Sequence, residues 1–147
     1  MDRVRARPGR IGFLTAMKFM LLIYNDPARL GAMTADGFDS AMRTCLEHAD
    51  ELKREGRLLE SQMLDDATNA KSVRIRNGRQ TTIDGPFAET KEVLGGFNLI
   101  DAESIDEAVR IAAEFPWAQS GCVEVRAVRD IEVVRKRVGL EAAARAR

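Results

Sequence analysis

The sequence has no net charge, and this absence excludes whole classes of partner. Lys plus Arg and Asp plus Glu are balanced at 23 each among 147 residues. A chain without excess positive charge has no long-range field that would draw it to nucleic acid or to an acidic membrane surface. We therefore expect no direct nucleic-acid partner.

Histidine and cysteine are also scarce. His48 is the single histidine, and Cys45 and Cys122 are the two cysteines, so a metal site of several histidines or regularly spaced cysteines lacks ligands. A catalytic triad would have to be built around His48. Cys45 falls on the apolar side of a predicted helix and Cys122 opens a predicted strand. We expect two buried free thiols, no metal site and a reducing, cytoplasmic location.

Long apolar runs are absent as well. No segment approaches the roughly 20 residues that a membrane-spanning helix needs, so we expect no membrane partner. Gly95-Gly96 is not followed by a predicted helix, as a phosphate-binding loop would be, and we expect no cofactor. The hydrophobic content of 45% is ordinary for a globular protein, and the length fits one domain with a sizeable core.

The two ends of the chain differ in composition from its middle. Residues 1–16 hold four arginines, one acid and a Pro-Gly breaker, and their apolar stretch is too short for a signal peptide. A basic arm that touches nucleic acid is the less favoured alternative, because the remainder is neutral. We expect residues 1–16 to be a disordered N-terminal extension, 17–130 the folded domain and 131–147 a C-terminal helical tail.

The first half of the domain predicts a strand, a helix and a strand. Residues 18–24 are apolar after the opening Lys18, a pattern typical of a central strand covered on both faces. After a loop, Thr34 or Asp36 caps a helix with one apolar stripe, and Gly56 ends it. A second strand is expected over residues 58–64.

The second half predicts a hairpin, then a strand, a helix and a strand. An alternating segment around Asn77-Gly78, the strongest short hairpin signal, predicts a hairpin over residues 72–83. A strand over residues 96–101 precedes a helix that the capping box from Ser104 to Glu107 opens. A final alternating strand begins near Val123.

This order predicts an α+β fold. Two strand–helix–strand units, with a hairpin inserted between them, build an antiparallel sheet with both helices on one face. The other face would then be an exposed apolar patch, and patches of that size usually mark an interface. A two-fold dimer that packs face to face would cover it, so we expect a homodimer.

The segment between the hairpin and the next strand concentrates breakers and charges. Its breakers are Gly85-Pro86 and Gly95-Gly96, and its ionisable residues are Asp84, Glu89, Lys91 and Glu92. Two interpretations are open. Either Asp84 caps a rigid surface turn that Glu89 and Lys91 brace, or Asp84 and Glu89 are partly desolvated carboxylates that act as bases beside a pocket.

This segment resembles the signature of the DGPF proteins, the YCII-related family. Residues 84–92 read Asp-Gly-Pro-Phe-Ala-Glu-Thr-Lys-Glu and residues 95–97 read Gly-Gly-Phe. Three further segments resemble the family in the same order, so the resemblance spans about residues 17–129: 17–24, 73–79 and 123–126. It implies a ferredoxin-like subunit that forms a dimeric α+β barrel with a pocket, and it implies no particular reaction.

Turn chemistry and resemblance together define the expected site. Asp84 and Glu89 are the catalytic candidates. The other expected pocket and loop residues are Tyr24, Gly85, Pro86, Phe87, Thr90, Lys91, Glu92, Gly95 and Gly96. Lys91 is expected to pair with one of the acids or to bind an anionic group. A histidine early in the first helix is proposed to act in another branch of the family. His48 lies late in its predicted helix, so we expect a boundary residue there.

Two functions remain open. The chain is either a small-molecule enzyme without an organic cofactor, in which pocket carboxylates transfer protons, or a non-catalytic ligand-binding or regulatory module. The second follows from the resemblance, since such relatives often accompany alternative sigma factors. The sequence has no helix-turn-helix pattern, which argues against direct DNA binding.

Overall fold

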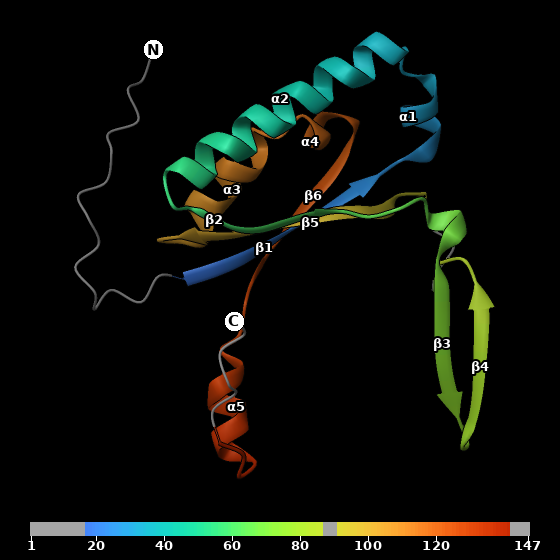
Figure 1. The fold of residues 1–147 in the computed structure, drawn as a ribbon, viewed down its shortest axis with the longest axis vertical. Coiled ribbons are helices and arrows are strands. Elements are labelled where there is room, and N and C mark those ends of the chain that lie inside the picture. Colours follow the sequence, from blue (N-terminus) through green and yellow to red (C-terminus); the bar gives the residue numbers. More distant parts are fainter. Residues whose placement is uncertain (1–16, 87–90, 142–147) are drawn as a thin grey trace.

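The main body is a four-stranded antiparallel sheet with helices packed on one face (Figure 1). The computed structural model describes residues 17–86 and 91–141. The sheet strands are β1 (Met17–Asn25), β2 (Leu58–Met63), β5 (Val93–Ala102) and β6 (Gly121–Ala127), in the spatial order β2-β5-β1-β6. The helices are α1 (Pro27–Ala32), α2 (Ala35–Arg54), α3 (Ile105–Ala113), α4 (Trp117–Ser120) and α5 (Ile131–Arg137). The predicted α+β, ferredoxin-like order is confirmed.

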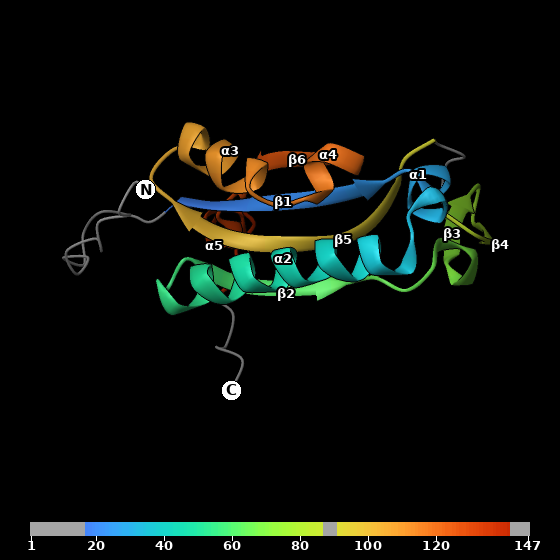
Figure 2. The ribbon, with the colours of Figure 1, turned by 90° about the horizontal axis from the view of Figure 1, so that it is seen from above.

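The apolar run of β1 places alternate side chains on the two faces of the sheet. Phe19, Leu21 and Ile23 are buried beneath the helices, whereas Met20 and Leu22 are half-buried on the opposite side. Figure 2 shows α2 and α3 side by side over one face of the sheet. The core lies between these two layers, as the two-layer architecture requires.

The helix boundaries follow the predicted capping residues. Thr34 Oγ1 accepts a hydrogen bond from Gly37 N at 3.0 Å at the start of α2. Gly56, with φ of 72°, stands two residues beyond its end. Ser104 Oγ accepts from Glu107 N at 3.2 Å at the start of α3. Each bond satisfies a backbone donor that the first helical turn leaves without a partner.

Two expectations about local structure are wrong. The loop predicted after β1 contains helix α1, because Asp26 caps Ala28 N at 3.0 Å and Pro27 occupies the first helical position. A proline that ends a strand is also preorganised to begin a helix. Both cysteines are free, but Cys45 is half-buried and Cys122 is exposed rather than buried. Cys122 lies opposite Tyr24 of β1, on the face of the sheet that α2 and α3 do not cover.

The inserted hairpin forms a separate two-stranded sheet. Its strands are β3 (Lys71–Arg76) and β4 (Arg79–Asp84). The turn residues Asn77 and Gly78 have φ values of 52° and 74°, both in the left-handed region that a two-residue hairpin turn requires. All of its strand residues except Ser72 are exposed, so the hairpin has little packing of its own.

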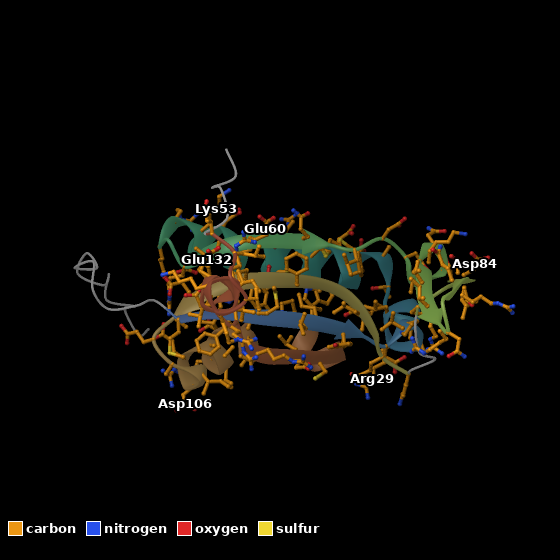
Figure 3. All side chains as sticks on the ribbon, turned by 90° about the horizontal axis from the view of Figure 1, so that it is seen from below. Arg29, Lys53, Glu60, Asp84, Asp106 and Glu132 are labelled. Atoms are coloured by element: carbon orange, nitrogen blue, oxygen red, sulfur yellow. The ribbon has the colours of Figure 1, made fainter. Side chains whose placement is uncertain are left out.

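The face of the sheet turned away from α2 and α3, here called the outer face, is apolar. Its residues on β1 and β5 include Met20, Leu22, Tyr24, Phe97 and Leu99. Figure 1 shows α5 and the β3–β4 hairpin extending from this side of the sheet. In Figure 3, α5, marked by Glu132, lies in front of the sheet, and the hairpin, marked by Asp84, lies beyond its other end.

The expected extension over residues 1–16 and the tail beyond residue 141 lie outside the described residues. Within the described tail, α5 ends at Arg137 and Gly139 follows with φ of 81°. Among the described helices, none is long and apolar enough to cross a membrane.

Candidate functional site

A cavity of about 910 Å³ opens between α1, α2 and the β2–β5 side of the sheet. Its helical wall is apolar and consists of Leu30, Phe38, Met42, Cys45, Leu46 and Trp117. Small-molecule sites typically enclose roughly 300–1,000 Å³ with mainly apolar walls and a few placed polar groups. Both the size and the lining therefore suit a small organic molecule.

Three side chains hold the helical wall together. The Phe38 and Trp117 rings are tilted at 42° with centroids 6.1 Å apart, within the range of favourable aromatic pairs. Trp117 Nε1 donates to Cys45 Sγ at 3.3 Å. Burial raises the pKa of the Cys45 thiol, although the hydrogen bond from Trp117 opposes the shift. Cys45 is therefore a packing residue with little thiolate character.

The floor of the cavity carries a hydrogen-bonded polar pair, in which Asn98 is buried and Ser61 is exposed. The Asn98 side chain belongs to β5 on the helix-facing side, and the residue is 3% exposed. Ser61 Oγ, on the neighbouring strand β2, donates to Asn98 Oδ1 at 2.5 Å. Asn25, at the end of β1, also lines the cavity, and its buried Oδ1 has no hydrogen-bond partner among the described residues.

Carboxylates gather at the mouth. Asp65, Asp66 and Asp84 all line the cavity where β2 and the hairpin end. Asp66 Oδ1 accepts from Thr68 N at 2.9 Å and from Thr68 Oγ1 at 2.8 Å, and these bonds lower the pKa of the Asp66 carboxyl. The acids are thus held in short polar turns around the 3-10 helix at Ala67–Asn69.

The structure places Asp84 at the mouth, in a cross-strand ion pair. Its Oδ1 accepts from Lys71 Nζ at 2.5 Å, and the Asp84 side chain is 81% exposed. The turn that follows is held by other groups: Gly85, with φ of 97°, donates its N–H to Ala70 O at 2.6 Å, and its carbonyl accepts from Ser72 Oγ at 2.8 Å. Gly85 and Pro86 line the mouth.

Of the remaining predicted loop residues, some lie outside the described residues and others lie just before β5. Phe87, Glu89 and Thr90 lie outside the described residues. Lys91 is largely exposed, with its Nζ 4.0 Å from Asp26 Oδ2, and Glu92 is half-buried. Lys91 thus contacts the buried cap of α1, and its expected pairing with a loop acid stays a prediction.

Gly95 and Gly96 line the cavity, whereas Tyr24 is not part of the described lining. A Cβ on Gly95 would lie 2.4 Å from Asn25 Nδ2, and one on Gly96 would lie 2.8 Å from Gln62 O. Two glycines in a strand thus permit the close approach of a side chain and of a neighbouring backbone. Tyr24 lies on the outer face, because strand alternation separates it from the cavity-lining Ile23 and Asn25.

His48 lies at a different, more polar surface. Its Nε2 is 3.2 Å from Ile111 O and its Nδ1 is 3.4 Å from Glu114 Oε2, and its ring meets the edge of Phe115 at 4.4 Å. These contacts tie α2 to α3, so the expectation of a boundary histidine is confirmed. Among the described residues there is no group of three or more side chains that suits a metal ion.

The same surface carries an ion pair that joins two further elements. Arg57 Nη2 donates to Glu107 Oε1 at 2.6 Å, and Arg57 Nη1 donates to Glu55 Oε2 at 3.0 Å. Burial acts to lower the pKa of Arg57, but the two carboxylates outweigh it and the pKa is raised. The cluster fixes the start of α3 against the end of α2 and is structural.

The floor of the cavity was not predicted from the sequence. Asn98 stands between Phe97 and Leu99 in an otherwise apolar strand, and a polar residue on the core-facing side is unusual unless it is hydrogen-bonded. That pattern was the available signal. Ser61 has no comparable local signal, because its pairing with Asn98 across β2 and β5 arises only in the folded chain.

Comparison with known proteins agrees with this arrangement. The sequence profile of the YCII-related domain matches residues 17–132. An uncharacterized protein of Rhizobium meliloti (strain 1021) is 36% identical over 112 residues, which cover 75% of this chain and 90% of the relative. The match to the profile begins at the first residue of β1 and includes the whole sheet and the cavity.

Proposed function

Because the chain belongs to the family of YCII-related domain proteins, we propose that it binds a small organic molecule in the cavity between α2 and the sheet. The observation that carries this proposal is the cavity itself, about 910 Å³ in volume. Its walls are largely apolar, and Asn98 is a buried polar group placed among them. Such a combination is what a binding site for a small molecule needs.

Ligand binding is better supported than proton transfer by Asp84. A carboxylate acts as a base at neutral pH when burial or a neighbouring negative charge raises its affinity for a proton. Asp84 has neither of these surroundings, because its side chain is 81% exposed and is paired with the cation Lys71. Asp84 and Glu89 stay catalytic candidates only within an enzymatic alternative that needs no organic cofactor. A regulatory module that responds to its ligand in the cytoplasm is consistent with binding alone.

We propose further that the chain functions as a homodimer through the outer face. The half-buried apolar residues of β1 and β5 are left without a covering layer by α2 and α3. Exposed apolar side chains of α5 and the hairpin border the same side: Val73, Ile75, Ile131 and Val133. A two-stranded hairpin alone is marginal in water, so a second copy that packs against it would supply the missing contacts.

A thermal-shift screen of small molecules tests the binding proposal, because a ligand of the native state raises its melting temperature. Trp117, the single tryptophan, lies in the cavity wall and reports occupancy by its fluorescence. Met42→Trp, which fills the cavity, should abolish the effect of a hit. Val109→Trp, at a position on α3 that is 50% exposed and outside the cavity, should leave it unchanged. A hit that binds both variants equally would place its site elsewhere.

A further inference from the structure

The lining of the cavity is uneven in charge. Among the described residues that line it, three are acids and none is Lys, Arg or His. The cationic side chain that contacts one of these acids is Lys71, and it is already paired with Asp84. An anionic ligand would therefore lose hydration without gaining a counter-charge, and it would approach carboxylates of its own sign.

Asn98 offers a specific polar contact within this lining. Because Ser61 Oγ donates to Oδ1, the amide is oriented with Nδ2 as its remaining group, and Nδ2 donates no hydrogen bond to any described residue. The residue is 3% exposed, but Nδ2 is not among the buried side-chain atoms that lack a partner, so this donor is accessible from the cavity that Asn98 lines. A ligand oxygen placed beside this donor would accept a hydrogen bond from it within a largely apolar lining, where such a bond is worth more than it is in water.

The distance between this donor and the acids sets the shape of the ligand. Asp65 follows Ser61 by four residues, two of them beyond the end of β2, and a chain of that length spans at most roughly 13 Å. The wall that the helices supply over this distance is apolar. A molecule of two linked rings has this length.

Resting on the proposed function, we infer that the cavity takes a neutral or cationic, mainly apolar molecule that presents an acceptor oxygen to Asn98 Nδ2. Aromatic ketones, amides and alcohols belong to this class. A cationic or hydrogen-bond-donating group at the opposite end would meet the acids of the mouth. Carboxylates and phosphates are excluded from the class by the charge of the lining.

Three biphenyl probes that differ only at the para position test the inference: the acetyl, the ethyl and the carboxylate derivatives. Binding is measured by isothermal titration calorimetry with the full chain. The acetyl probe should bind about tenfold or more tightly than either of the others, because only it gives Asn98 an acceptor without a charge. Asn98→Leu should remove the preference for acetyl over ethyl, and Gln119→Leu, at an exposed amide outside the cavity, should preserve it.

The outcomes separate the two proposals. If none of the probes binds, yet the screen finds a hit that Met42→Trp abolishes, the inference falls and the binding function stands. Tight binding of the carboxylate, or an acetyl preference that survives in Asn98→Leu, also overturns the inference. Should Asn98→Leu fail to fold, Ser61→Ala serves instead. It frees the amide to rotate and should weaken the acetyl preference without removing the residue.

Discussion

At the residue scale, Cys45 tests how firmly the cavity wall is packed. It is half-buried against Trp117. Because burial raises the pKa of Cys45, we expect iodoacetamide to alkylate it about tenfold or more slowly in the native protein than in the chain unfolded by urea, at the same mildly alkaline pH. Peptide mass spectrometry over time measures both rates. Equal rates would mean that the wall opens readily, and a bound ligand should slow the reaction of the native protein alone.

The same thiol predicts a dependence of stability on pH. The folded pKa of Cys45 lies above its ordinary value, so the unfolded chain releases the proton first. The contribution of Cys45 to the free energy of unfolding is complete below about pH 8.5 and is lost as the pH rises through the folded pKa. Urea titrations of the wild type and Cys45→Val at neutral and alkaline pH should show the wild type losing stability relative to the variant. A constant difference between them would contradict this.

The ion pair between Lys71 and Asp84 should contribute little to the free energy of unfolding. Both side chains are more than two-thirds exposed, at 67% and 81%, and exposed pairs contribute about 0–1 kcal/mol. Asp84→Asn should lower the free energy of unfolding by less than about 1 kcal/mol and change the affinity of a screening hit less than Glu89→Gln does. Binding and melting curves of both variants measure this. Loss of all binding in Asp84→Asn alone would assign Asp84 a direct role.

At the element scale, the close approach of β5 to β2 depends on Gly96. A Cβ there would lie 2.8 Å from Gln62 O, whereas a Cβ on Gly31 of α1 would meet nothing within 4 Å. Gly96→Ala should therefore destabilise the protein by about 1–3 kcal/mol. Gly31→Ala should stabilise it by up to about 1 kcal/mol, because alanine favours helix. Chemical denaturation compares the two, and equal stability would show that the sheet tolerates the added methyl group.

The elements were largely predictable because their signals are local. The apolar run of β1, the caps at Thr34 and Ser104 and the Asn77-Gly78 turn each act within a few residues of the chain. Helix α1 was not predicted because the pair Asp26-Pro27 is typical both of the end of a strand and of the start of a helix. Only the tertiary structure decides between the two. The start of β5 was placed three residues late, at Gly96 rather than Val93, since paired glycines indicate a turn when read alone.

The site was less predictable because its groups meet only in the folded chain. The DGPF segment predicted a site, and three of its residues, Asp84, Gly85 and Pro86, line one edge of the cavity. The floor, with Ser61 and Asn98, depends on the register between β2 and β5. A register is fixed by long-range packing, which the local pattern does not encode.

At the scale of the whole molecule, the outer face predicts the oligomeric state. Leu22 lies on this face between Phe97 and Glu124 of its neighbouring strands. Leu22→Glu would place a second charge beside Glu124 in the proposed interface, so it should convert a dimer into a monomer. Val109→Glu, an exposed position on α3, should leave the dimer intact. Sedimentation velocity at low micromolar concentration measures both, and a monomeric wild type would overturn the proposed dimer.

The hairpin has a thermodynamic consequence that extends beyond its own strands. Its two ends join the rest of the chain at the cavity mouth, through Ala70 and Gly85, whose backbones are hydrogen-bonded at 2.6 Å. Any partner that steadies the hairpin therefore also steadies the mouth, and the two binding events become linked with one reciprocal coupling free energy. Ligand affinity should then rise as the protein is concentrated, and saturating ligand should tighten self-association by the same factor.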